Sequence, residues 1–353
     1  MTIIFAILLF SFLIFIHELG HFIAAKLSGV QVNEFSMFMG PAIFKKQKGE
    51  TLYSIRCIPI GGYCAMEGED GESDNPRAFG KAAWWKRLII LIAGSGMNFI
   101  AGILLMFCLL VPADVVTVPV IQQFEAYSTV DGADGLQVGD RFIEVDGERV
   151  FTPNDLDLIF MLNPGEVHDV VVERNGEKVV LSDFVMQLHT VTDENGNELQ
   201  RYGMQFAGVK ASFSVKVQQA WYRSLNTVRI ARLSLQMLIT GKAGLKDMSG
   251  PVGIVKLMSD TAAASENTMA AVMNMLYIGG FLAINLAVMN MLPIPALDGG
   301  RVVGLLITTV VEKITKKKID PKYEGYLHGA GMILLLILMA VIMFKDIFVI
   351  FKG

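Results

Sequence analysis

The 353-residue sequence has little charge, few cysteines and no excess of basic residues. Charged residues make up 18% of the chain, against about 25% in ordinary soluble domains. The formal net charge of -4 gives no indication of a nucleic-acid partner. The three cysteines are too few and too unevenly spaced for a cysteine zinc site or a disulfide framework, although Cys57 and Cys64 could pair. These shortages argue against a disulfide-stapled secreted domain and a nucleic-acid-binding protein.

Apolar residues are abundant instead: 53% of the chain is hydrophobic and the mean hydropathy is +0.49. Four segments are long and apolar enough to cross a bilayer of about 30 Å, at residues 2–25, 88–111, 274–310 and 328–351. Prolines and paired glycines interrupt the third, which we therefore expect to be a broken helix. The pattern predicts an α-helical, multi-pass membrane protein with about four transmembrane helices.

The first apolar run is expected to stay in the protein rather than to be cleaved as a signal peptide. It has no basic residues at its start, and it ends in His17-Glu18 rather than in a small-residue cleavage site. Apolar residues resume at positions 22–25. We interpret residues 2–25 as a membrane helix.

This helix contains the sequence His17-Glu18-Leu19-Gly20-His21. Histidines four residues apart share a helix face and can bind one metal ion, while Glu18 is turned by about 100° and can reach a water on that metal. A chance match to this short pattern is the alternative. Because ionisable residues are costly within a membrane segment unless they have a use, we favour a catalytic metal site.

A catalytic zinc ion usually has three protein ligands and one open position. Asp298 is the main candidate for the third ligand, because it lies between apolar stretches at the break in the third span. Its alternative role is to cap a helix at that break. The other histidines, His168, His189 and His328, have no second pair at metal-binding spacing.

Three segments resemble the membrane motifs of the site-2 proteases: the segment around His17 and His21, the pattern Gly94-x-x-x-Asn98, and Asn290-x-x-Pro293-x-Pro295-x-Leu297-Asp298-Gly299. The similarity covers nearly the whole chain and is greatest to the RseP-type bacterial branch. Residues 59–63 resemble that branch's hairpin segment, residues 135–147 its PDZ domain, and residues 249–254 the segment before its third span. The chain has room for only one PDZ domain, whereas some members of the branch have two.

The resemblance implies an intramembrane zinc endopeptidase that hydrolyses peptide bonds within transmembrane segments of membrane proteins. Regulated proteolysis of anti-sigma factors or signal-peptide remnants would fit. It implies one Zn²⁺ per chain held by His17, His21 and Asp298, with Glu18 as the catalytic residue. The residues that match its substrate-binding positions are Asn290, Pro293 and Asn98. The chain departs from the family at Gly94-Ser95, where a proline usually follows the glycine, and at Phe38-Met39-Gly40, which has an extra methionine.

We expect four parts along the chain. Residues 1–111 form the first half of a membrane core, with a membrane-associated β-hairpin over 30–64, and residues 246–353 form the second half. Residues 115–208 form an α/β PDZ domain. Residues 212–245 form an amphipathic helix along the membrane surface, because apolar residues recur there at helical spacing with basic residues between them.

Charge predicts the orientation. Basic residues concentrate in the connectors 26–87 and 313–322, whereas residues 112–210 contain 18 acidic and 6 basic side chains. The positive-inside tendency places both connectors in the cytoplasm and the PDZ domain outside. In a bacterial inner membrane the active site would then lie toward the cytoplasmic side. Expected partners are the lipid bilayer and transmembrane substrates trimmed beforehand by another protease.

Two other functions are compatible with parts of the sequence. One is a non-catalytic PDZ scaffold with a vestigial metal site. The other is a membrane zincin of the HtpX type that cuts soluble loops, but such enzymes take a glutamate as third ligand. The set of His17, Glu18, His21 and Asp298 favours the intramembrane protease over both.

Overall fold

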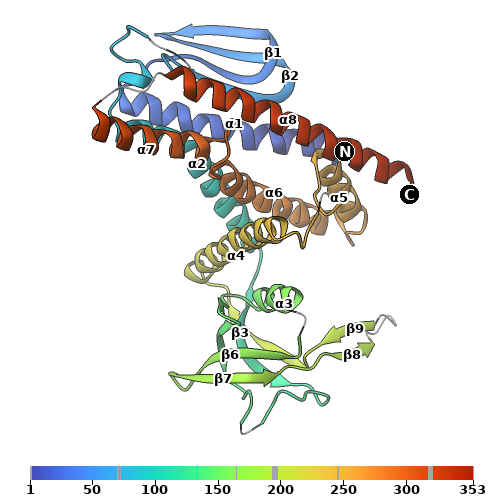
Figure 1. Ribbon diagram of the computed structural model, residues 1–353. Coiled ribbons are helices and arrows are strands. Elements are labelled where there is room, and N and C mark those ends of the chain that lie inside the picture. Colours follow the sequence, from blue (N-terminus) through green and yellow to red (C-terminus); the bar gives the residue numbers. More distant parts are fainter. Residues whose placement is uncertain are drawn as a thin grey trace. The chain divides into compact units, whose positions relative to one another are not determined.

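The computed structural model describes residues 2–352, except 70, 72, 133, 164, 193–197, 245 and 317–320. The chain divides into two compact units. The first consists of Met1–Leu109 together with Thr227–Gly353, and the second of Leu110–Asn226. Long helices dominate the first unit and a β-sheet the second (Figure 1).

Four helices of the first unit contain stretches long and apolar enough to cross a membrane. They are α1 (Thr2–Ser28), α2 (Trp84–Leu110), α6 (Thr268–Asn290) and α8 (Pro321–Lys352). The corresponding stretches are Ile3–Ser28, Trp84–Leu110, Thr268–Asn290 and Gly325–Val349. Side chains such as Ile4, Leu104 and Leu334 are largely exposed on these helices, as expected where lipid rather than protein covers an apolar surface. The described chain therefore has the multi-pass architecture that its composition predicts.

The third predicted span, 274–310, differs from the observed structure. Helix α6 ends at Asn290, residues 291–297 are not helical, and α7 (Asp298–Thr315) begins a new helix. Pro293 and Pro295 lack the amide hydrogens that would continue α6, and Ala296 has a positive φ of 80°. Of α6 and α7, only α6 is long and apolar enough to cross a membrane. The break is thus a complete change of helix at Asp298 rather than a kink in one span.

In the predicted hairpin over 30–64, the second strand turns back and pairs with the first strand a second time. Strands β1 (Val32–Lys48) and β2 (Thr51–Met66) are antiparallel, but residues 34–37 of β1 pair on one side with residues 52–55 and on the other with residues 62–65. The chain can return in this way because β2 turns back near Gly61, which has a φ of 80°. The returning part of β2 packs beside α1.

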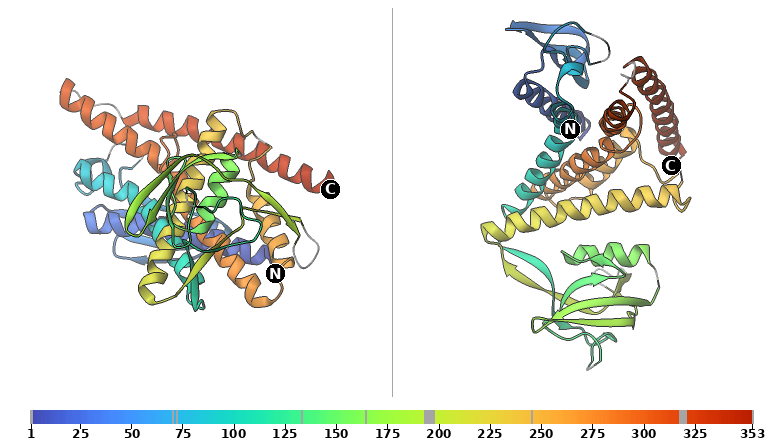
Figure 2. Two further views of the ribbon diagram at one scale, coloured as in Figure 1. Left: turned by 90° about the horizontal axis from the view of Figure 1, so that it is seen from below. Right: turned by 60° about the vertical axis from the view of Figure 1, so that its left-hand side comes forward.

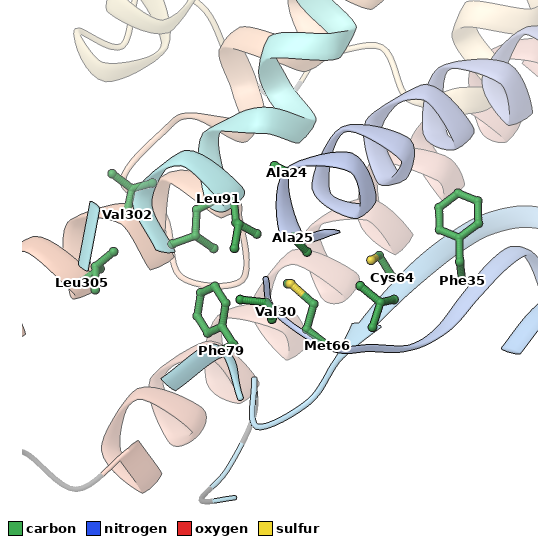
Figure 3. Close-up of a cluster of buried hydrophobic side chains, with 12 residues drawn as sticks. Ala24, Ala25, Val30, Phe35, Cys64, Met66, Phe79, Leu91, Val302 and Leu305 are labelled. Atoms are coloured by element: carbon green, nitrogen blue, oxygen red, sulfur yellow. The ribbon is translucent and has the colours of Figure 1, made fainter. Parts of the chain in front are cut away.

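A buried apolar cluster joins this sheet to the helices. Val30, Phe35, Cys64 and Met66 come from the sheet region, and Phe79 comes from the 3-10 turn η1 (Phe79–Lys81) that precedes α2. Figure 3 shows them together with residues of α1, α2 and α7. This packing ties the connector between the first two spans to the membrane helices. Two further helices, α4 (Phe213–Ile239) and α5 (Pro251–Ala263), precede α6.

The second unit is a sheet with the strand order β10-β3-β4-β6-β7. The strands are β3 (Val115–Phe124), β4 (Arg141–Val145), β6 (Val167–Arg174), β7 (Glu177–Val185) and β10 (Met204–Lys210). The short β5 (Glu148–Arg149) pairs with β4, and β8 (His189–Thr192) pairs with β9 (Glu198–Arg201). Helix α3 (Pro153–Leu162) lies over one face of the sheet (Figures 1 and 2).

Two local features of this unit follow directly from its sequence. The turn at Asn175-Gly176 joins β6 and β7, as a type I′ hairpin signal predicts. Helix α3 is capped by Thr152, in a capping box with Asp155. Pro153 then occupies the first helical position, where its missing amide hydrogen costs nothing.

Candidate metal centre

Three side chains from two distant parts of the chain meet in the first unit. His17 and His21 project from the same face of α1, and their Nε2 atoms lie 3.2 Å apart. Asp298 is the first residue of α7, and its Oδ2 atom lies 3.2 Å from His17 Nε2 and 3.3 Å from His21 Nε2. Among the described residues, this is the one group of histidine, cysteine and acidic side chains close enough to bind a metal ion.

The geometry of these atoms fits a zinc ion. Zinc–nitrogen and zinc–oxygen bonds of about 2.0–2.1 Å in a tetrahedral site place neighbouring ligand atoms about 3.3 Å apart. Asp298 Oδ2 is buried and has no hydrogen-bond partner of normal geometry, although a buried oxygen without a partner is costly. A shared cation would satisfy this oxygen and both imidazole nitrogens at once.

Helix α2 orients one of the histidines. His21 Nδ1 lies 2.8 Å from the carbonyl oxygen of Ile90 and donates a hydrogen bond to it, because the carbonyl can only accept. The Nε2 lone pair is then left for a metal. The corresponding Nδ1 atom of His17 is buried and has no hydrogen-bond partner in the described structure.

Two glycines let α2 approach these histidines. A Cβ atom at Gly94 would lie 2.3 Å from His21 Nε2 and 2.8 Å from His17 Cε1, so both imidazoles pass directly over its backbone. A Cβ atom at Gly20 of α1 would lie 2.3 Å from the carbonyl oxygen of Ala93. Contacts this short leave no room for a side chain at either position. The Gly94-x-x-x-Asn98 motif thus includes a residue needed to seat the histidines, a role that sequence reasoning did not assign.

The residues around Asp298 fold back on themselves by the same means. A Cβ atom at Gly299 would lie 2.3 Å from the carbonyl oxygens of Met291 and Leu292, and one at Gly300 would lie 2.3 Å from that of Ile294. The amide of Ala296 donates to His328 Nδ1 of α8, at 3.0 Å. The paired glycines therefore let the loop 291–297 close over the start of α7, where it holds Asp298 in place.

Glu18 lies beside the returning part of β2. A Cβ atom at Gly62 would lie 3.5 Å from Glu18 Cγ, so the absent side chain leaves space next to the carboxylate. Cys64 lies on the same strand, and burial, together with the charge of Glu18, raises the pKa of its thiol. Cys64 does not belong to the group of side chains close enough to bind a metal ion, which consists of His17, His21 and Asp298.

The remaining predicted site residues lie outside the three-ligand group. Asn98 is buried in α2 one turn after Gly94, and its Oδ1 atom has no hydrogen-bond partner within the described chain. Asn290 is the last residue of α6 and is half-buried, whereas Pro293 is exposed in the following loop.

His168 of the second unit is held by two hydrogen bonds within that unit and does not belong to the metal-binding group. Its Nδ1 atom lies 2.7 Å from Asp146 Oδ2, and its Nε2 atom lies 2.9 Å from the carbonyl oxygen of Gly165. Burial opposes ionisation of Asp146, but hydrogen bonds from His168 and the Asp169 amide outweigh it and lower the pKa of Asp146. These contacts fix the start of β6 against the turn after β4.

Comparisons with known proteins cover nearly all of this chain. A sequence model described as Peptidase family M50 matches residues 5–338. A Clostridium acetobutylicum protein whose name contains the words zinc metalloprotease is 37% identical over 352 residues, covering 98% of this chain and 97% of the relative. A similarly named protein of Clostridium perfringens is 34% identical and covers 98% of each chain. The Regulator of sigma-W protease RasP of Bacillus subtilis is 28% identical, again covering 98% of each.

Proposed function

This chain belongs to Peptidase family M50, and we propose that His17, His21, Asp298 and Glu18 form its catalytic centre. Its membership in this family and its relatives named as zinc metalloproteases identify the chain as an intramembrane metalloprotease with Zn²⁺ as its cofactor. The observation that carries the residue assignment is the meeting of three ligand atoms 3.2–3.3 Å apart, one of them a buried carboxylate oxygen without a hydrogen-bond partner.

The depth of this centre supports cleavage within the membrane. His21 lies seven residues before Ser28, where the first candidate span ends, which corresponds to about 10 Å along the helix. Gly94, which the histidines contact, lies ten residues after the start of the second span, or about 15 Å. A peptide bond that reaches this site therefore lies inside the apolar layer.

Glu18 is the general base of the proposed reaction. Zinc, when bound, supplies a Lewis acid that polarises the scissile carbonyl and makes water a better acid. The Glu18 carboxylate takes a proton from the attacking water and passes it to the nitrogen of the leaving amine. The rotation of about 100° between successive helix residues places Glu18 beside the metal ligands, but not in a position to be a ligand itself.

The returning part of β2 offers a place for the substrate backbone. A transmembrane helix hides its carbonyls in hydrogen bonds, so it must unwind locally before cleavage. Residues 62–65 pair with β1 on one side, and an extended substrate segment added at their other edge would satisfy the freed groups. Asn290, Pro293 and Asn98 are the further substrate-binding residues in this proposal. The partnerless Oδ1 atom of buried Asn98 is consistent with a polar group kept for a ligand.

Replacement of Asp298 tests the ligand set. Asp298→Asn is expected to lower zinc affinity by at least roughly 100-fold and to abolish cleavage, because a neutral amide donates poorly to zinc and leaves the charge of the ion less compensated. Asp298→Glu should retain part of the zinc affinity. Zinc content after dialysis against a graded chelator measures both, with Asp260→Asn on α5 as a carboxylate control. Full zinc occupancy and normal cleavage in Asp298→Asn would mean that the third ligand lies elsewhere.

The orientation we propose has the basic connectors 26–87 and 313–322 in the cytoplasm and the second unit outside, in a bacterial inner membrane. Its support is the charge distribution, with five lysines in the second connector and an acidic excess in the second unit. The metal centre lies about 10 Å from the end of α1 that enters the first connector, and therefore on the cytoplasmic side.

Cysteine labelling tests this orientation. In a chain without Cys57, Cys64 and Cys108, a cysteine at exposed Lys178 of β7 should react with an impermeant maleimide in cells whose outer membrane has been made permeable. A cysteine at exposed Lys45 of β1 should react only after the inner membrane is opened. Labelling of the position 45 variant with the inner membrane intact would reverse the proposed orientation.

We also assign the second unit as a PDZ domain that restricts access by size, so that substrates must first be trimmed by another protease. Its sheet capped by a short helix and its glycine-rich segment 135–147 support the assignment. A large folded extracellular part of a substrate could not pass such a domain, whereas a trimmed stump could.

Deletion of the domain tests the size filter. Thr117 and Gly208 are paired neighbours on β3 and β10, so residues 118–207 can be replaced by a short glycine-serine linker with little disturbance to the flanking chain. The deletion variant should cleave an untrimmed model substrate at a rate within roughly tenfold of a trimmed one, unlike the full chain. Cleavage rates for both substrates, normalised to zinc content, measure this. Unchanged discrimination would leave the domain without a gating role.

A further inference from the structure

A pocket of about 330 Å³ lies where the first two spans meet the connector between them. One wall is formed by Ser28, Gly29 and Val30, and the other by residues on either side of the 3-10 turn before α2. The full lining comprises Ser28, Gly29, Val30, Pro76, Arg77, Ala78, Lys81, Ala82, Ala83 and Lys86. This pocket is separate from the metal centre, and the proposed protease reaction does not use it.

The two walls place the pocket at the level of the lipid headgroups. The first candidate span ends at Ser28 and the second begins at Trp84, so the walls immediately follow one span and precede the other. Val30, which lines the pocket, lies with Phe79 in one cluster of buried side chains (Figure 3). The amide of Gln31 donates to the carbonyl oxygen of Arg77 at 3.0 Å. The pocket is thus built from chain segments fixed to each other at the membrane surface.

The lining is suited to an anion. It contains three basic residues, Arg77, Lys81 and Lys86, and no acidic one. Ala82 and Ala83 directly precede α2, a helix of 27 residues, whose first amide hydrogens have no partner within the helix and form its positive end. The amides of Lys86 and Arg87 already donate to the carbonyl oxygen of Ala83, so the cationic side chains are the donors that the pocket offers to a phosphate group.

The contacts that the three basic residues already make do not cancel the positive charge of the pocket. Lys86 Nζ donates to the carbonyl oxygen of Ser28 at 3.0 Å, and this contact holds the side chain across the pocket. Because the carbonyl oxygen carries no net charge, it does not neutralise the ammonium group. Arg77 forms an ion pair with Glu50 at 3.3 Å, but Glu50 lies outside the lining and also pairs with Lys26. Lys81, which also lines the pocket, is exposed.

Exposed apolar residues of the two candidate spans directly adjoin lining residues in the chain. Trp84 and Trp85 are about half exposed, and Leu27 is 84% exposed. Tryptophan is typical of the membrane interface, where its ring lies at headgroup depth. A ligand with a phosphate in the pocket and acyl chains along these residues would cover both surfaces.

We propose that this pocket binds the phosphodiester headgroup of an anionic phospholipid, with the acyl chains against Leu27, Trp84 and Trp85. Lys81 and Lys86 contact the phosphate beside the positive end of α2, and Arg77 adds to the positive field. The lipid would hold the connector, and through it the sheet beside α1, at a constant depth.

Tryptophan quenching by brominated lipids tests the proposal directly. The full chain with Trp221→Phe, so that only Trp84 and Trp85 fluoresce, is reconstituted in phosphatidylcholine nanodiscs. A small fraction of the lipid carries brominated acyl chains on either phosphatidylglycerol or phosphatidylcholine. Quenching by the phosphatidylglycerol should be greater, and each cation near the phosphate contributes roughly a fivefold preference (about 1 kcal/mol).

Matched variants separate the pocket from general surface charge. Arg77→Gln with Lys81→Gln, and also the single change Lys81→Glu, should remove most of the excess quenching, a loss of roughly tenfold or more in relative affinity. Lys81→Arg should keep it. The control Lys45→Gln with Lys46→Gln removes the same charge from exposed positions of β1 and should change nothing. Retained zinc content confirms that each variant is folded.

Three results would overturn the proposal. The first is equal quenching of the unmodified chain by both brominated lipids. The second is an equal loss of the excess in the control at Lys45 and Lys46, which would indicate diffuse attraction to the surface. The third is stabilisation of the chain by inorganic phosphate in pure phosphatidylcholine nanodiscs, absent from Lys81→Glu and without any preference for phosphatidylglycerol. That outcome would assign the pocket to a soluble phosphate compound instead.

Discussion

Glu18→Gln is expected to lower cleavage of a model transmembrane substrate by roughly 10²–10⁴-fold, the usual contribution of a general base, while zinc stays bound at one ion per chain. The amide has nearly the shape of the carboxylate but cannot accept the proton of the attacking water. Zinc should remain because Glu18 does not belong to the group of ligand atoms formed by His17, His21 and Asp298.

Cleavage in detergent and zinc content by mass spectrometry measure the two properties on the same sample. His17→Ala is the matching control, because it should lose zinc and cleavage together and so distinguishes a ligand from a base. A Glu18→Gln variant with more than about a tenth of the original activity would fall outside the range of general-base effects and contradict the role assigned to Glu18.

Gly94→Ala is expected to lower zinc affinity by at least roughly 10–100-fold, the range found when the support of a metal ligand is removed, and to lower cleavage with it. The added Cβ atom would lie 2.3 Å from His21 Nε2 and 2.8 Å from His17 Cε1. Neither imidazole can easily move away, because His21 is held by the carbonyl oxygen of Ile90 and His17 by the helix that carries it.

Gly96 provides a control on the same helix. No atom lies within 4 Å of a Cβ atom built at Gly96, and alanine favours a helix over glycine by about 1 kcal/mol at either position. Gly96→Ala should therefore keep zinc and activity and unfold at the same or a slightly higher temperature. Chelator competition and thermal unfolding of both variants give the comparison. Equal zinc affinity in Gly94→Ala and Gly96→Ala would show that the imidazoles do not depend on the bare backbone at Gly94.

Much of the membrane architecture could be predicted because its causes are local. A run of apolar residues long enough to cross a bilayer forms a helix wherever it occurs, and three of the four spans lie within a few residues of their predicted bounds. The placement of His17 and His21 on one face follows from helix geometry alone. Asp298 could be singled out because a lone carboxylate among apolar residues needs a partner.

Other features depended on distances between residues far apart in the chain. Apolar character continues through residues 291–310, so hydropathy extended the third span past Asn290. The structure instead ends α6 there and starts α7 at Asp298. The cause is the close fold of the loop 291–297 onto Gly299 and Gly300, a backbone contact that leaves no periodic signal in the sequence.

The sequence by itself determined which residue types this protein brings to its metal centre and which segments can cross a membrane, because both follow from side-chain chemistry and helix geometry. Only the tertiary structure decided that β2 turns back beside Glu18, that the imidazoles lie over Gly94, and that a basic pocket forms between Ser28 and Trp84. Each of these joins positions more than 40 residues apart. Such contacts are set by how closely two backbones can approach, which no local pattern of residues records.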